Sequence, residues 1–142
     1  LEPREPATAS RLLTASPLAQ LASYAPEGAY CVHSDNSRGP EGARRNLRAL
    51  TAIAYATPPD WSDEDAGCLR LWLGTDEVDC NVSGPEALGE ELRAAAAPHV
   101  DVAPLPGRVV IFRSTLLHEV RPTALRPRRA ITQWFLAPYV GC

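Results

Sequence analysis

The feature that most constrains the fold of this chain is how often proline and glycine interrupt it. Fourteen prolines and nine glycines divide the 142 residues into short pieces. Most pieces are rich in Val, Ile, Leu, Tyr, Trp or Thr, a composition that favours β-strands separated by turns. The sequence predicts strands at 18–24, 29–35, 47–56, 68–73, 99–103, 107–113, 117–121 and 128–137. Short strands in this number predict an all-β fold of the jelly-roll type.

Two segments depart from the strand pattern. Residues 83–98, SGPEALGEELRAAAAP, place Ser83 as a cap before Pro85, and Leu88 and Leu92 are spaced i, i+4. We predict one short inserted helix, anchored to the β-structure by these leucines. Residues 36–46, NSRGPEGARRN, are too long and polar for a tight hairpin, so they predict a mobile loop placed to cover a site.

Length, charge and cysteine content limit the classes of function. The 142 residues suit a single domain, 1–142, with one core. A net charge of −3 gives no basic field for nucleic acid. No apolar run approaches the roughly 18 residues that predict a membrane helix. We therefore expect neither a nucleic-acid nor a membrane partner, and the sequence leaves the oligomeric state open. The four cysteines lack CxxC spacing and are expected to be mostly reduced. A cytoplasmic or nuclear location is favoured, with the secretory pathway left open.

Two histidines and an aspartate form the pattern of a metal site. His33 and Asp35 are two residues apart in a predicted strand, so their side chains would project from one face. His118 begins a later predicted strand. Two histidines and one carboxylate match the facial triad of non-haem Fe(II) oxygenases, which leaves positions open for O₂ and a chelating cosubstrate. His-x-Asp alone is a weak signal, so the surrounding residues decide whether it marks a metal site. His99 lies outside the pattern and is expected to be a surface or structural histidine.

The last predicted strand carries an arginine on what would be an inward face. Strand alternation places on that face Arg128, Ala130, Thr132 and Trp134. A buried arginine is costly without an anion, and a ligand carboxylate is the simplest partner. The spacing leaves an alternative open, in which Arg128 faces solvent or an internal glutamate beside Arg126 and Arg129.

Several ordered blocks of sequence point to one family. They are YCVHSDN at 30–36, TAIAY at 51–55, GCLRL at 67–71, HEVRP at 118–122 and RRAITQW at 128–134. Over roughly residues 20–137 the chain resembles the Fe(II)/2-oxoglutarate-dependent prolyl hydroxylases, most closely the type that acts on hypoxia-inducible factor and its microbial relatives. The blocks together are far more specific than any one of them.

The resemblance implies a fold and a role for each matching residue. The fold would be a double-stranded β-helix, the jelly roll of this family. His33, Asp35 and His118 would ligate Fe(II). The residues implied to contact 2-oxoglutarate are Arg128 at its distal carboxylate, helped by Tyr55 and Thr132, with Ile53 and Leu69 packed along it and Tyr24 at the pocket. O₂ would be the second cosubstrate, and ascorbate is a candidate reductant.

The implied reaction is hydroxylation of a prolyl residue in a protein or peptide, with 4-hydroxylation favoured and with release of succinate and CO₂. Alternatives are a 2-oxoglutarate oxygenase of another class (a prolyl 3-hydroxylase, a ribosomal-protein hydroxylase or a small-molecule hydroxylase) and a non-catalytic jelly-roll binding module. The chain departs from the family in three ways: the interval between Asp35 and Thr51 is longer, one extra residue precedes Arg128, and residues 1–17 leave no room for the usual supporting N-terminal helices.

Overall fold

The computed structural model describes residues 13–39, 42–76, 78 and 84–138. The strands in the described residues are β1 (Thr14–Tyr24), β2 (Tyr30–His33), β3 (Arg48–Tyr55), β4 (Leu69–Trp72), β5 (His99–Val102), β6 (Val109–Arg113), β7 (His118–Val120) and β8 (Arg128–Leu136). The one α-helix in these residues is α1 (Pro85–Ala94), and a 3-10 turn, η1, spans Asp63–Asp65.

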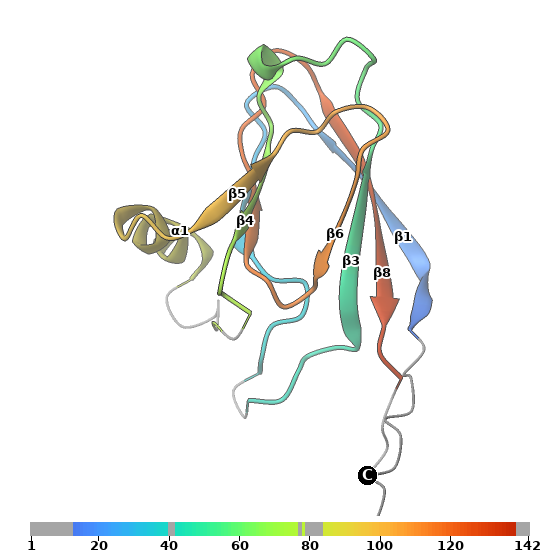
Figure 1. Cartoon of the computed structure of the whole chain (residues 1–142), viewed down its shortest axis with the longest axis vertical. Helices are drawn as coiled ribbons and strands as arrows, with labels where there is room; N and C mark the ends of the chain where they lie inside the picture. The colour runs from blue at the N-terminus through green and yellow to red at the C-terminus, as the bar shows by residue number, and fades with distance from the viewer. Residues whose placement is uncertain (1–12, 40–41, 77, 79–83, 139–142) are drawn as a thin grey trace, which may run out of the picture.

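The strands form two four-stranded antiparallel sheets that face each other (Figure 1). We call β1-β8-β3-β6 the major sheet and β2-β7-β4-β5 the minor sheet. Alternate residues of both sheets point inward and form a buried cluster of Ile53, Tyr55, Leu69, Phe112, Val120 and Ala130. This order of strands is the predicted jelly roll, and the prediction is confirmed.

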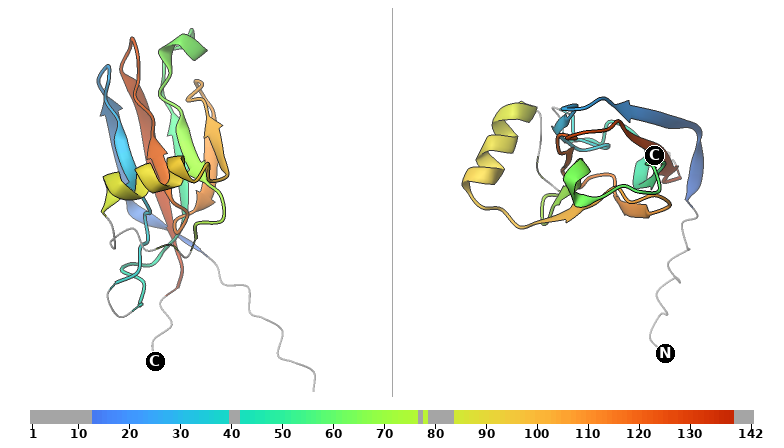
Figure 2. Two further views of the ribbon diagram at one scale, coloured as in Figure 1. Left: turned by 90° about the vertical axis from the view of Figure 1, so that its left-hand side faces the viewer. Right: turned by 90° about the horizontal axis from the view of Figure 1, so that it is seen from above.

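Helix α1 packs outside the minor sheet, as the predicted leucine spacing requires (Figure 2). Leu88 is buried with Val32, Trp72 and Leu117, and Leu92 is partly buried against the same cluster. Close packing depends on Gly89, because a Cβ there would lie 3.1 Å from Val32 Cγ2.

The ends of α1 differ from the prediction. Gly84 is the N-cap residue, and the predicted cap Ser83 lies outside the described residues. The helix stops at Ala94 because Ala96 takes a positive φ of 48°. The N–H of Ala97 then donates to the carbonyl of Leu92, which closes the helix with a Schellman motif.

The start of the chain and the end of β2 also differ from the prediction. Strand β1 begins at Thr14 rather than at residue 18. Strand β2 ends at His33, so Asp35 lies in a turn and not on the strand. The chain turns there because Asn36 donates from its backbone N–H to the Ser114 carbonyl and from Nδ2 to the Arg48 carbonyl, at 2.9 and 2.6 Å.

Two further expectations concern cysteines and membranes. Cys31 and Cys68 are free thiols, whereas Cys80 and Cys142 lie outside the described residues. In the part of the chain that the structure describes, every helix is too short or too polar to cross a bilayer.

Candidate metal centre and cosubstrate cavity

His33, Asp35 and His118 lie together at one end of the space between the two sheets. The register of β2 and β7 pairs His33 with His118 directly, and the turn after β2 brings Asp35 between them. One ligand atom from each residue lies within 4.8 Å of the others. Asp35 Oδ1 is 3.7 Å from His33 Nε2, and Asp35 Oδ2 is 3.9 Å from His118 Nε2. This spacing allows the three side chains to bind one metal ion.

Both histidines are oriented by main-chain carbonyls. His33 Nδ1 lies 2.9 Å from the Cys31 carbonyl, and His118 Nδ1 lies 2.9 Å from the Leu116 carbonyl. Each carbonyl accepts an N–H, which assigns the proton to Nδ1 and leaves the Nε2 lone pair for a metal. Burial, together with the neighbouring His33, lowers the pKa of His118 to about 4, so its ring is neutral at pH 7.

Asp35 is held by two donors from the major sheet. Its Oδ2 accepts hydrogen bonds from Thr51 Oγ1 at 2.7 Å and from Trp134 Nε1 at 3.0 Å. Burial opposes ionisation of the carboxyl, but the nearby His118 and these two hydrogen bonds outweigh it and lower the pKa of Asp35. The carboxylate is therefore ionised at neutral pH, with Oδ1 available as a ligand.

The triad opens into a cavity of about 490 Å³ between the two sheets. The predicted cosubstrate residues that line it are Tyr24, Ile53, Leu69, Arg128 and Thr132. Tyr55 does not line the cavity; it is buried against Arg128, whose guanidinium carbon lies 5.0 Å from the centre of the Tyr55 ring. None of the described residues of the predicted covering loop, 36–39 and 42–46, lines the cavity.

Arg128 is the buried cation of this cavity, with a relative exposure of 1%. Its Nε donates to the Gly67 carbonyl at 2.9 Å. Its Nη2 is buried without a hydrogen-bond partner among the described residues, as is the Tyr55 hydroxyl. Burial lowers the pKa of Arg128, but a guanidinium stays charged in proteins. The alternative in which Arg128 faces solvent is wrong; the neighbouring Arg129 is the exposed one.

The donors in this cavity fit a metal and an anionic ligand. Two imidazole nitrogens and one carboxylate oxygen form the donor set of the Fe(II) facial triad. An anion of carboxylate type would satisfy the unpaired Nη2 of Arg128. The metal site and the anion site share one cavity, as a molecule with a chelating end and a distant carboxylate requires.

Several residues that build the site carry little or no signal in the sequence. Strand alternation predicts an inward face for Trp134, but no sequence pattern predicts the hydrogen bonds from Thr51 and Trp134 to Asp35. Arg48 also lines the cavity, with its guanidinium 3.7 Å from the centre of the Trp134 ring. Gly67, which accepts the Arg128 hydrogen bond, is signalled in sequence only by its place in the GCLRL block.

Comparisons with known proteins agree with this geometry. The family model described as the 2OG-Fe(II) oxygenase superfamily matches residues 19–136. A prolyl-4-hydroxylase from Pseudomonas putida superimposes with a TM-score of 0.61 and 26% sequence identity, over 84% of this chain and 52% of that one. No curated protein sequence matches the chain.

Two other solved structures show the same fold at lower identity. A prolyl hydroxylase from Trichoplax adhaerens, solved with a hypoxia-inducible-factor peptide, has a TM-score of 0.63 and 24% identity, over 91% of this chain and 47% of that one. An N-substituted L-amino acid dioxygenase from Burkholderia ambifaria has a TM-score of 0.57 and 22% identity, over 93% of this chain and 56% of that one. The chain thus spans about half the length of these solved structures.

Proposed function

Since this chain belongs to the 2OG-Fe(II) oxygenase superfamily, we propose that it is a dioxygenase that hydroxylates a prolyl residue in a protein or peptide, with 4-hydroxylation favoured. The observation that carries the proposal is that one cavity contains both the His-Asp-His triad and the unpaired guanidinium of Arg128. With O₂, bound iron and 2-oxoglutarate supply the oxidising chemistry, which releases succinate and CO₂ and adds one oxygen atom to a C–H bond of the substrate.

The side chains of the chain bind and orient these groups. His33 and His118 would bind the metal through Nε2, since Nδ1 of each donates to a main-chain carbonyl, and Asp35 contributes the single negative charge of the triad. Arg128, with Thr132 in the same cavity, would hold the distal carboxylate of 2-oxoglutarate, so that its keto-acid end reaches the metal.

The prolyl substrate is supported by sequence blocks and by one solved structure. The blocks HEVRP and RRAITQW resemble those of prolyl hydroxylases, and the Pseudomonas putida prolyl-4-hydroxylase shares 26% identity with the chain. Proteins described as acting on other molecules share the fold at lower identity, among them the N-substituted L-amino acid dioxygenase. A substrate screen therefore has to include both peptides and free amino acids.

The test is a mass-spectrometric screen with the purified protein, Fe(II), 2-oxoglutarate, O₂ and ascorbate. We expect a proline-containing peptide to gain the mass of one oxygen atom while succinate accumulates in equal amount. The matched control peptide carries alanine in place of the proline and should remain unmodified. Hydroxylation of a free or N-substituted amino acid, with all proline peptides unchanged, would contradict the prolyl assignment but retain the oxygenase.

A further inference from the structure

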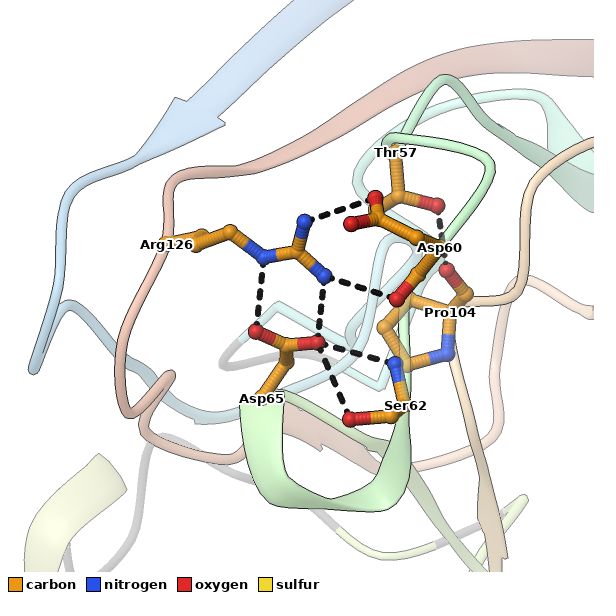
Figure 3. Close-up of polar contacts among 6 residues, drawn as sticks. All are labelled: Thr57, Asp60, Ser62, Asp65, Pro104 and Arg126. Carbon is orange, nitrogen blue, oxygen red and sulfur yellow. Dashed lines mark hydrogen bonds and ion pairs between the residues drawn. The ribbon is translucent and has the colours of Figure 1, made fainter.

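Arg126 forms an ion-paired cluster with Asp60 and Asp65, two residues before the buried Arg128 (Figure 3). Arg126 donates from Nε and Nη2 to Asp65 Oδ1 and Oδ2, at 2.8 and 2.6 Å. It also donates from Nη1 to Asp60 Oδ1 and from Nη2 to the Asp60 carbonyl, at 2.8 and 3.0 Å. The Asp65 side chain is only 4% exposed and accepts a further bond from the N–H of Ser62. We call Asp60, Asp65 and Arg126 the clasp.

The clasp joins two segments of the chain that are distant in sequence. One segment runs from Asp65 to Gly67, and the other runs from residue 122 through Arg126 to the start of β8. Backbone hydrogen bonds connect the same segments, since the N–H of Ala124 donates to the Asp65 carbonyl and the N–H of Gly67 donates to the Pro122 carbonyl, at 2.9 and 3.0 Å. Side-chain and main-chain contacts therefore fix Gly67 relative to β8.

Gly67 connects the clasp to Arg128, which lines the cavity. Its carbonyl accepts the Nε–H of Arg128 at 2.9 Å. Gly67 has a positive φ of 73°, and a Cβ there would lie 2.9 Å from Thr123 Cγ2 and 3.3 Å from Arg128 Cδ. The backbone at Gly67 is thus packed directly against the arginine, so a shift of this backbone displaces the guanidinium.

We infer that the clasp positions Arg128 for the distal carboxylate of 2-oxoglutarate, with Asp65 and Arg126 acting through the Gly67 carbonyl as positioning residues. This inference rests on the proposed function. A long arginine side chain loses conformational entropy when it binds an anion, and a side chain already held in place loses less of it on binding. The clasp also engages the guanidinium of Arg126, which does not line the cavity.

The test compares two probes on protein loaded with Mn(II), using calorimetry under anaerobic conditions. The first probe is 2-oxoglutarate, which reaches both the metal and Arg128; the second is oxalate, which chelates the metal but has no distal carboxylate. For D65N we expect the Kd of 2-oxoglutarate to rise by roughly tenfold, as on loss of an outer partner of a binding group. The Kd values of oxalate and of Mn(II) should stay unchanged.

The chain offers a matched control in the Arg70–Asp101 pair. Arg70 donates from Nε and Nη2 to Asp101 Oδ1 and Oδ2, both at 2.7 Å, which repeats the geometry of the Arg126–Asp65 pair. D101N removes this bidentate pair from strand β5 and should leave the Kd of both probes unchanged. R126K is the second clasp variant, because lysine keeps the charge but loses the bidentate geometry. R126K should also raise the Kd of 2-oxoglutarate. If D65N does not fold, R126K alone tests the inference.

Two results would overturn the inference. An unchanged Kd of 2-oxoglutarate in the folded clasp variants would show that Arg128 needs no support from the clasp. An equal rise in the Kd of both probes would show a general loss of structure instead of a displaced arginine. Failure of the proposed function looks different: the unsubstituted protein would then bind oxalate but not 2-oxoglutarate, and the inference would fall with it.

Discussion

At the scale of single residues, the metal centre depends on how Asp35 is held. This carboxylate lies in a turn, where the backbone alone would leave several side-chain positions open. The hydrogen bonds from Thr51 and Trp134 to its Oδ2 select one of them. Because these donors come from β3 and β8 of the major sheet, while both histidines come from the minor sheet, the triad requires both sheets to be assembled.

We predict that W134F weakens metal binding by about 10–100-fold, the usual effect of removing an outer partner of a metal ligand. Phenylalanine retains an aromatic ring but loses the Nε1–H that bonds Asp35. Titration with Mn(II), followed by electron paramagnetic resonance, measures the change. The matched control is W72F, because Trp72 Nε1 is buried without a hydrogen-bond partner among the described residues. Equal Mn(II) affinity in W134F and the unsubstituted protein would disprove the role given to Trp134.

At the scale of secondary-structure elements, Leu88 attaches α1 to the minor sheet. Leu88 is 7% exposed and packs into the cluster formed with Val32, Trp72 and Leu117. We predict that L88A lowers the free energy of unfolding by about 2–5 kcal/mol, as large-to-small substitutions in cores do. Urea unfolding measures this. L21A is the control, since Leu21 on β1 is 74% exposed; a similar loss in both variants would contradict the anchoring role of Leu88.

The connection between η1 and β8 predicts a pH dependence of stability. Hydrogen bonds from Arg126, supported by the N–H of Ser62, lower the pKa of Asp65 from 3.8 to about 2. A carboxyl whose pKa is lower in the folded state stabilises the fold above its ordinary pKa, and this contribution is lost as the pH falls through the lowered value. The stability difference between the unsubstituted protein and D65N should therefore be constant above about pH 5 and shrink from about pH 4 to pH 2.

Urea midpoints of both proteins, measured at a series of pH values, test this prediction. D101N provides the comparison for an exposed ion pair, since the Asp101 side chain is 38% exposed and its pKa is also lowered by Arg70. Exposed pairs contribute little to stability, so we expect a smaller pH-dependent difference for D101N. A D65N difference that stays the same at every pH would show that the charge of Asp65 contributes nothing to folding.

At the scale of the whole molecule, the cavity lies between the two sheets, so its ligands should stabilise the folded chain. A ligand that binds only the folded state at 100 times its Kd adds about 2.7 kcal/mol to the free energy of unfolding. We expect Mn(II) to raise the melting temperature and 2-oxoglutarate to raise it further. In R128A the Mn(II) shift should remain and the 2-oxoglutarate shift should disappear. R129A, which alters an exposed neighbour, should behave like the unsubstituted protein; loss of both shifts in R128A would assign Arg128 a structural role.

The strand faces could be predicted from the sequence because each inward face is continuous over several residues. The alternation along 128–134 put Arg128 and Thr132 on one face, which lines the cavity, and Arg129 on the other, where it is exposed. The family resemblance added what alternation left open, namely that Arg128 points inward. Local boundaries were less predictable: the end of β2 depends on bonds from Asn36 to Ser114 and Arg48, which a local pattern does not contain.

The sequence by itself determined the alternating strands, the inserted amphipathic helix and the identity of the three metal-binding candidates, because periodicity and residue chemistry are local properties. Only the tertiary structure decided that Asp35 reaches the triad from a turn and that Thr51 and Trp134 hold it there. It also decided that Arg128 donates a hydrogen bond to the Gly67 carbonyl, which lies next to the clasp in sequence. These contacts join residues that are far apart in the sequence. They form only when the two sheets pack face to face, which no local sequence pattern specifies.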